Sequence, residues 1–262
     1  MIYMKNELRK KIVDMIVKAG EGHIPSSFSI VDIISVLFEG HLKFDPKRPD
    51  WEGRDYFVLS KGHGCAALNV VLNKHGFITK NDIDTCGKID AILGGHPDRT
   101  KVAGVEASTG SLGHGLPYSV GIALGQKILN NSNKVYVLVG DGECHEGSVW
   151  ESALVAQNMK LDNLCCIVDY NGSAAQILPH PDIVGQWRAF GWTTILIDGH
   201  NSEELNKAFN DFKDNQTGKP FVIIANTVKG KGVSFLETHG PWHHKIPNDK
   251  EYKAIMEELE HV

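Results

Sequence analysis

Two apolar runs, each followed by a polar residue beside a glycine, constrain the fold of this chain more than any other feature. Residues 135–139 (VYVLV) and 164–168 (LCCIV) are typical of buried strands in a parallel sheet. A helical pattern that begins after Gly147 connects them, with Val149, Ala153, Val155 and Ala156 mostly on one face. Asp141 follows the first run and Asn171 follows the second. Because the carboxyl ends of parallel strands lie at one edge of a sheet, we expect Asp141 and Asn171 to converge.

The residue types at this edge indicate a site for a cation and a phosphate group. A carboxylate and an amide oxygen suit a hard divalent cation such as Mg²⁺. The glycines beside them (Gly140, Gly142 and Gly172) let the backbone approach phosphate oxygens. Asp-Gly or Asn-Gly alone would indicate only a turn. The joint order of strand, Gly-Asp-Gly, helix, strand and asparagine is more specific, and it resembles the thiamine-diphosphate motif in the diphosphate-binding half of transketolase.

The resemblance to transketolase continues in order along essentially the whole chain. The further segments that carry it are GHIPSS at 22–27, SKGHG at 60–64, GHPD at 95–98, TGSLGHG at 109–115, KGKGV at 229–233 and WHHK at 242–245. Chance could supply one such segment but hardly the ordered set. The sequence is therefore similar to the transketolase family over its full length.

Several residues depart from the family pattern. Pro25 stands where the first segment usually has glycine, and His114 replaces a common glutamine. His244 occupies a position that is often glycine, so His243 and His244 are both candidates for the functional histidine there. The residues that follow Asn171 (GSAAQIL) also differ from the family.

The resemblance implies a cofactor, a metal ion and the residues that hold them. Thiamine diphosphate is the implied cofactor, with Mg²⁺, or Ca²⁺ or Mn²⁺ in its place. The implied metal ligands are Asp141, Asn171 and the backbone carbonyl of Ser173. The implied cofactor contacts are His63, Leu112, Gly113, Gly142, Glu143, Asn171 and His243.

The resemblance also implies an activity and its catalytic residues. The implied reaction transfers a two-carbon ketol unit from a ketose phosphate to an aldose phosphate. His23, His96 and His243 are the implied catalytic residues. They would orient ketose hydroxyls or move protons at the donor carbonyl, a usual task for histidine near neutral pH.

The alternation of strand and helix patterns predicts a single α/β domain over residues 1–262, with a mostly parallel sheet and helices on both faces. The predicted strands are 56–59, 135–139, 164–168, 192–197 and 221–225. The predicted helices include 5–19, 30–38, 182–190 and 203–212. A break from Gly20 to Pro25 separates the first two helices.

The composition argues against several classes of protein. A net charge of -5 and the lack of a long Lys/Arg run argue against nucleic acid or an anionic membrane as a partner. Met1 to Lys11 lacks the apolar block of a signal peptide. The sequence also contains no run of ~18 apolar residues, the length needed to cross a bilayer. Five cysteines without a C-x-x-C pair predict reduced thiols in a cytoplasmic protein, with Cys165 and Cys166 in the core.

The sequence leaves no room for a second domain that the family uses. In the family, that α/β domain carries the glutamate that activates the aminopyrimidine ring and the arginines that bind the sugar phosphate. It needs on the order of 150 residues, whereas about twenty follow Trp242 here (262 − 242 = 20). We therefore expect a separate C-terminal transketolase subunit with the pyrimidine-binding domain and assembly into a heterotetramer. We expect an apolar docking face that includes residues 109–116 and Glu146.

Two other enzyme classes use parts of this pattern. The α subunit of a 2-oxo-acid dehydrogenase shares the thiamine motif but should lack the SKGH, GHPD and TGSLG segments. The second class is a nicotinamide dehydrogenase, because Gly62, Gly64 and Ala67 fit a truncated dinucleotide fingerprint. Such a site needs an acidic residue at the end of the next strand, and Asp82 and Asp84 lie in no predicted strand.

Three further alternatives concern the role of the chain rather than its fold. A transketolase-like subunit for another sugar phosphate stays open, because sugar selectivity lies partly in the second domain. A degenerate half-domain that only binds a partner is disfavoured by the intact Asp141, Asn171 and histidines. A metal pair of His239 and His243 is disfavoured because Pro241 breaks the helix that such a pair needs.

Overall fold

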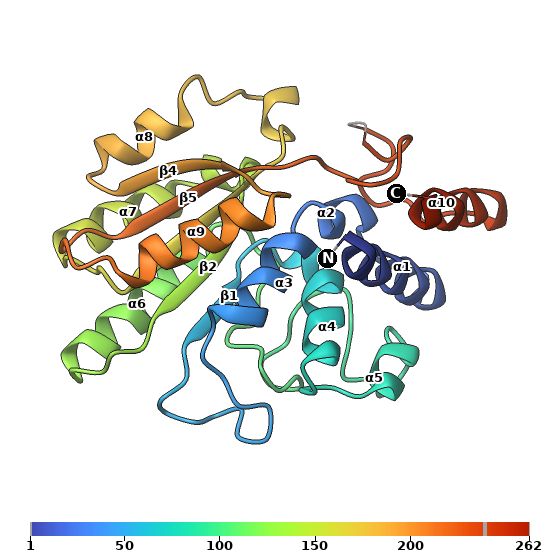
Figure 1. The fold of residues 1–262 in the computed structure, drawn as a ribbon, viewed down its shortest axis with the longest axis horizontal. Coiled ribbons are helices and arrows are strands. Elements are labelled where there is room, and N and C mark those ends of the chain that lie inside the picture. The colour runs from blue at the N-terminus through green and yellow to red at the C-terminus, as the bar shows by residue number, and fades with distance from the viewer. Residues whose placement is uncertain (1, 238–239, 262) are drawn as a thin grey trace.

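A five-stranded sheet forms the centre of the protein in a computed structural model that describes residues 2–237 and 240–261 (Figure 1). The strands are β1 (Tyr56–Leu59), β2 (Val135–Gly140), β3 (Leu164–Tyr170), β4 (Thr193–Asp198) and β5 (Phe221–Asn226). Their order across the sheet is β1-β2-β3-β5-β4, and every neighbouring pair is parallel. The predicted α/β class and the predicted strands are confirmed.

Helices connect the strands and cover the sheet. They are α1 (Ile2–Ala19), α2 (Ile24–Phe28), α3 (Val31–Gly40), α4 (Cys65–Lys74), α5 (Lys80–Asp84), α6 (Gly115–Ile128), α7 (Gly147–Asn158), α8 (Ile183–Ala189), α9 (Ser202–Lys213) and α10 (Asp249–His261). Short 3-10 turns are η1 (Gly62–Gly64), η2 (Gly142–His145) and η3 (Ala174–Gln176). Figure 1 shows α1 and α10 packed side by side at one end of the molecule.

The sheet separates two apolar cores because side chains alternate along each strand. In β2, Tyr136 and Leu138 enter the core shared with α1, α3, α4, α9 and α10. Val135, Val137 and Val139 enter the other core, which α6, α7 and α8 complete. All five side chains are fully buried, which explains why the run is apolar throughout rather than alternating. Helices therefore cover both faces, as predicted.

Two local predictions differ from the structure. The predicted break up to Pro25 is shorter than expected, because α2 begins at Ile24 with the proline in its first turn. Proline is tolerated there because the N–H it lacks would have no partner within the helix. In α7, Val149, Ala153 and Ala156 share the buried face of the helix, but Val155 is exposed because it lies on the other side.

The cysteines lie inside the fold, as expected for Cys165 and Cys166. All five cysteines are free thiols and buried, with Cys165 and Cys166 inside β3. Burial raises the pKa of each of these two thiols well above its ordinary value. Across residues 2–237 and 240–261, no helix is both long and apolar enough to cross a membrane.

The carboxyl ends of all five strands deliver polar residues to one edge of the sheet. Lys61 follows β1, Asp141 follows β2 and Asn171 follows β3. His200 follows β4 and Thr227 follows β5. This edge is where parallel α/β sheets usually bind ligands.

Candidate functional site

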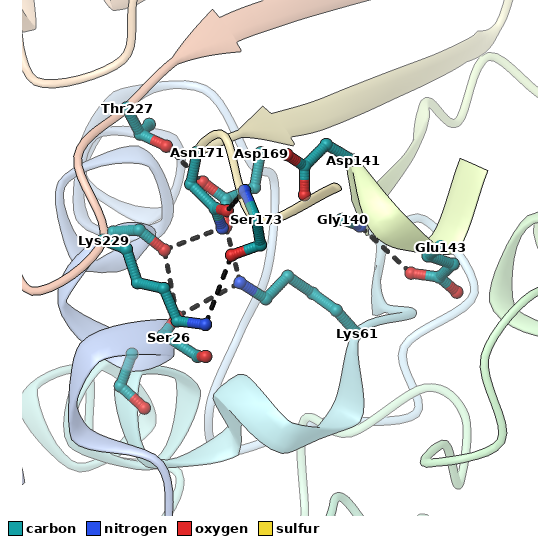
Figure 2. Close-up of polar contacts among 12 residues, drawn as sticks. Ser26, Lys61, Gly140, Asp141, Glu143, Asp169, Asn171, Ser173, Thr227 and Lys229 are labelled. Carbon is teal, nitrogen blue, oxygen red and sulfur yellow. Dashed lines mark hydrogen bonds and ion pairs between the residues drawn. The ribbon is translucent and has the colours of Figure 1, made fainter. Parts of the chain in front are cut away.

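A cavity of about 330 Å³ opens at the carboxyl edge of the sheet. Its lining includes charged, amide and imidazole groups with a few apolar side chains. The lining residues are Ser26, Lys61, His63, Leu112, Gly140, Asp141, Gly142, Glu143, His145, Asn171, Ser173, Ala174, Ile177, Lys229 and His243. Figure 2 shows the cluster around Asp141, Asn171 and Ser173, with Lys61 and Lys229 beside it.

The three proposed metal ligands all line this cavity. The carboxylate of Asp141 accepts backbone N–H groups from Gly142 at 2.8 Å and Ala174 at 3.2 Å. The side-chain oxygen of Asn171 accepts the N–H of Ser173 at 3.0 Å. Burial, reinforced by a neighbouring carboxylate, raises the pKa of Asp141. A cation beside Asp141 would counter that penalty by favouring its ionised form.

A buried ion pair lies directly beneath these residues. Lys61 is 1% exposed and Asp169 is 0% exposed, and their charged atoms are 2.5 Å apart. Asp169 also accepts hydrogen bonds from Ser29 at 2.8 Å and from Thr227 at 2.5 Å. Burial alone would raise the pKa of Asp169, but Lys61 and these hydroxyls outweigh burial and lower it. Lys61 also donates to the carbonyl of Ser26 at 3.2 Å.

The second lysine of the cavity, Lys229, follows β5 in the KGKGV segment. Its ammonium nitrogen lies 3.2 Å from Ser173 Oγ and 3.0 Å from Nδ1 of His243. Burial lowers the pKa of Lys229, and the positive charge of Lys61 lowers it further. Two ammonium groups beside Asp141 favour an anionic ligand that also meets a cation.

Four histidines cluster at the mouth of the cavity. The ring centroid of His23 lies 5.4 Å from that of His63, 5.1 Å from that of His243 and 4.5 Å from that of His244. Burial lowers the pKa of His63 to about 2, with a further contribution from Lys61. Burial and the neighbouring histidines lower the pKa of His23 to about 4. Both rings are therefore neutral near pH 7 and can donate one hydrogen bond and accept another.

The predicted catalytic histidines lie close together but differ in their relation to the cavity. His243 lines it, whereas His244 packs against His23 outside the lining residues. His96 is exposed and lies against the backbone of Gly110, where an added Cβ would come within 2.9 Å of its ring. Within the described part of the chain, the buried Nδ1 of His23 has no hydrogen-bond partner. That nitrogen is an orphaned polar atom that a ligand hydroxyl could satisfy.

Two of the predicted cofactor contacts, Glu143 and Gly113, are hydrogen-bonded to each other, and Glu143 lines the cavity. The carboxylate of Glu143 accepts from Ser60 Oγ at 2.5 Å and from the N–H groups of Gly113 at 2.8 Å and Gly140 at 3.1 Å. These bonds join three segments that surround the cavity. Gly113 has a φ of 81°, and an added Cβ would come within 2.6 Å of Glu146. Glycine is therefore required there by both conformation and space.

A stacked pair of histidines lies at the rim. The rings of His145 and His180 are 4.2 Å apart and 5° from parallel. Nε2 of His180 donates to the backbone carbonyl of Asp141 at 2.9 Å. Sequence reasoning assigned no role to either histidine, nor to Asp169 or Lys61. The signal for Asp169 is a charge directly after the apolar run of β3, where burial is expected.

One alternative site loses support from the structure, and another lies partly outside the described residues. Asp82 and Asp84 lie in α5, which Thr79 caps through a reciprocal bond with Asp82, so neither of them ends a strand as the acidic residue of a dinucleotide site does. In the described residues, no group of three or more His, Cys, Asp or Glu could hold a metal ion. His239 lies outside the described residues, so its suggested pairing with His243 has no structural account.

Comparison with known proteins identifies the family of the chain. The family model for "Transketolase, thiamine diphosphate binding domain" matches residues 3–259. The chain belongs to the transketolase family. It is 38% identical over 256 residues to an apulose-4-phosphate transketolase subunit of Phocaeicola vulgatus, covering 96% of this chain and 90% of that protein. It is 38% identical over 263 residues to the 6-deoxy-6-sulfo-D-fructose transketolase subunit SqwG of a Clostridium species, covering 98% and 95%.

Full-length transketolases are similar over part of their length. Human transketolase is 39% identical over 259 residues, which cover 96% of this chain and 41% of that protein. The solved transketolase of Leishmania mexicana superimposes with a TM-score of 0.92 at 28% identity, covering 99% of this chain and 41% of that chain. The chain thus spans about 41% of these two transketolases. As a thiamine-diphosphate-binding domain, it is expected to use the cavity at the carboxyl edge for that cofactor.

Proposed function

We propose that this chain is the thiamine-diphosphate-binding subunit of a two-chain transketolase. The complete enzyme would transfer a two-carbon ketol unit from a ketose phosphate to an aldose phosphate. The observation that carries the proposal is one cavity that combines Asp141, Asn171 and Ser173 with Lys229, His63 and His243. The neutral ring of His23 lies against both of these histidines. Relatives of nearly the same length that are named as transketolase subunits support the two-chain arrangement.

The donor set fits a diphosphate bound through a divalent cation. Asp141, the amide oxygen of Asn171 and the carbonyl of Ser173 would hold Mg²⁺, or Ca²⁺ or Mn²⁺. A site with one carboxylate leaves positions for phosphate oxygens, as Mg²⁺ sites commonly do. Lys229, His63 and His243 would then contact the diphosphate. When bound, the cofactor supplies the carbanion chemistry of ketol transfer, and the protein positions it.

The histidines at the cavity mouth are proposed to handle the ketose. Neutral His23 has a buried nitrogen free of protein partners in the described chain, and His243 and His96 lie close enough to help lower its pKa. Neutral imidazoles can bind hydroxyls without adding charge beside the lysines. Their role would be to orient the donor hydroxyls and to move protons at the donor carbonyl.

Replacing His23 or His96 by alanine is expected to lower kcat/KM for the donor ketose about 100-fold, within the range for general acid–base groups. The dissociation constant for thiamine diphosphate should change less than about threefold, because neither ring belongs to the proposed diphosphate contacts. Steady-state kinetics and calorimetry on the same preparations separate the two effects. Loss of cofactor affinity with normal turnover at saturating cofactor would contradict the substrate role.

The identity of the sugar phosphates is a finer part of the proposal. Xylulose 5-phosphate and ribose 5-phosphate are the proposed donor and acceptor. The names of two relatives make apulose 4-phosphate and 6-deoxy-6-sulfo-D-fructose specific alternatives. The match to transketolases over the whole chain disfavours the α subunit of a 2-oxo-acid dehydrogenase. A panel of these sugars, assayed with the assembled enzyme, distinguishes the donors.

The partner surface predicted around residues 109–116 and Glu146 is proposed to extend onto neighbouring exposed apolar side chains. In segment 109–116, Leu116 is fully buried and Leu112 is partly buried. Large exposed apolar side chains stand instead on α6 and α7, including Tyr118 and Leu154, and beside the cavity at Ile177, which is 92% exposed. A separate pyrimidine-binding subunit could cover both regions, and a heterotetramer is the proposed assembly.

The two-chain proposal predicts that the purified chain alone shows no ketol transfer at saturating thiamine diphosphate and Mg²⁺. Glu143 is the cavity glutamate, and its carboxylate is already held by Ser60, Gly113 and Gly140. It is therefore a poor candidate for the glutamate that the family uses on the aminopyrimidine ring. Adding the cognate second subunit should restore activity, measured with the sugar panel. Robust turnover by the chain alone would overturn the two-chain proposal.

A further inference from the structure

The loop at residues 227–231 carries Lys229 from the end of β5 to the cavity. The Lys229 ammonium contacts Ser173 and His243 there. Lys61 brings a second positive charge close enough to help lower the pKa of Lys229. Asp141 and Asp169 attract the Lys229 ammonium while Lys61 repels it. The position of Lys229 among these charges also depends on the backbone that carries it.

The backbone on each side of Lys229 is anchored by a side chain from elsewhere in the fold. The N–H of Val228 donates to Nε2 of His200 at 2.9 Å. Nε of Arg9 donates to the carbonyl of Lys231 at 2.9 Å. His200 comes from the β4–α9 connection and Arg9 from α1, so neither anchor belongs to the cavity lining.

One buried carboxylate joins these two anchors. Oδ2 of Asp32, on α3, lies 2.7 Å from Nδ1 of His200 and 2.7 Å from Nη2 of Arg9. The side chains of Arg9 and Asp32 are 4% and 3% exposed, and that of His200 is 11% exposed. Asp32 thus fixes the positions of both groups that hold the loop.

The hydrogen bonds also decide which nitrogen of His200 carries the proton. A backbone N–H can only donate, so the Nε2 that accepts from Val228 must be unprotonated. The ring proton is then on Nδ1, which donates it to Asp32. In the opposite tautomer, an N–H on Nε2 would face the N–H of Val228, and the anchor would be lost.

We propose that His200, as its Nδ1-protonated tautomer, is a positioning residue that holds Lys229 at the cavity through the backbone of Val228. The inference rests on the proposed function, because the ligand that Lys229 meets is taken to be the cofactor diphosphate. His200 itself touches neither cofactor nor substrate. Its effect on binding should therefore pass through Lys229.

The test is a double-mutant cycle on the binding of thiamine diphosphate with Mg²⁺, measured by calorimetry. His200→Phe keeps an aromatic ring but removes both hydrogen bonds, and should weaken binding about tenfold. His200→Gln retains an acceptor and a donor, and should stay within about threefold of the wild type. Lys229→Met should weaken binding at least about tenfold, as loss of a charged contact does. In the Lys229→Met background, His200→Phe should have almost no further effect.

The outcomes separate this inference from the proposed function. Wild-type affinity in His200→Phe, or an equal loss in both backgrounds, would overturn the positioning role. Failure of the wild-type chain to bind thiamine diphosphate when the second subunit is present would overturn the proposed function instead. The tautomer has its own readout in the ¹⁵N chemical shifts of the His200 ring, which need neither a variant nor a ligand. An Nε2-protonated ring would overturn the inference in every case.

Discussion

Asp141→Ala is expected to abolish Mg²⁺-dependent binding of thiamine diphosphate, with a loss of affinity of at least about 100-fold. Asp141 is the one carboxylate in the proposed ligand set, and a hard cation depends on it more than on neutral oxygens. Calorimetry with and without Mg²⁺ measures the loss. The Mg²⁺ dependence itself should also disappear in this variant. Asn171→Ala should act in the same direction but more mildly, because it removes a neutral ligand.

The fold should survive the Asp141 substitution. Burial raises the pKa of Asp141, so its ionised form destabilises the folded protein near neutral pH. Removing the carboxylate relieves that cost but loses the hydrogen bonds to Gly142 and Ala174, each worth about 1 kcal/mol. The net change in the free energy of unfolding should be within about 1 kcal/mol. Asp162→Ala, at the opposite edge of the sheet beside Lys127, is a matched control that should leave binding unchanged.

Lys61→Met is expected to lower the free energy of unfolding by about 3–5 kcal/mol, because it leaves the buried charge of Asp169 without its cation. The apolar stem of methionine retains most of the packing, so the loss reports mainly the charge. Chemical denaturation followed by circular dichroism measures it. Lys207→Met is the control, because its partner Asp211 is on the surface and exposed pairs contribute about 0–1 kcal/mol.

The pH dependence distinguishes a lost ion pair from a packing defect. In the wild type, the pKa of Asp169 is lowered, so its contribution to stability is present above the unfolded pKa and declines as the pH falls through the folded pKa. In Lys61→Met, burial without the cation should raise the pKa of Asp169. The deficit relative to wild type should then shrink as the pH is lowered. A deficit that is the same at every pH would indicate a packing effect instead.

Asp141→Ala and Lys61→Met test different parts of the same site. Asp141 and Lys61 both line the cavity, whereas Asp169, the buried partner of Lys61, does not belong to its lining. Asp169 also accepts from the amide of Asn171 at 2.7 Å, which orients the oxygen of that amide away from the buried pair. Asn171, the proposed metal ligand after β3, therefore depends on an ion pair that it does not itself belong to.

The sequence alone determined the elements and the edge at which the site forms. Apolar runs such as 135–139 report burial on both faces of a parallel sheet, because every side chain of such a strand enters a core. Gly-Asp-Gly after β2 and Asn-Gly after β3 report where the chain turns. From these local patterns, the convergence of Asp141 and Asn171 follows from the common direction of the strands.

Only the tertiary structure decided which distant groups meet at that edge. Lys61 and Asp169 are 108 positions apart, and Asp32 and His200 are 168 apart. Their pairing depends on the order of the strands across the sheet, β1-β2-β3-β5-β4. No periodicity or turn signal in the sequence encodes that order. Local patterns report backbone conformation and burial within a few residues, whereas partners of buried charges depend on how the whole chain packs. The low pKa of His63 has the same origin, because burial and Lys61 act on it only in the assembled fold.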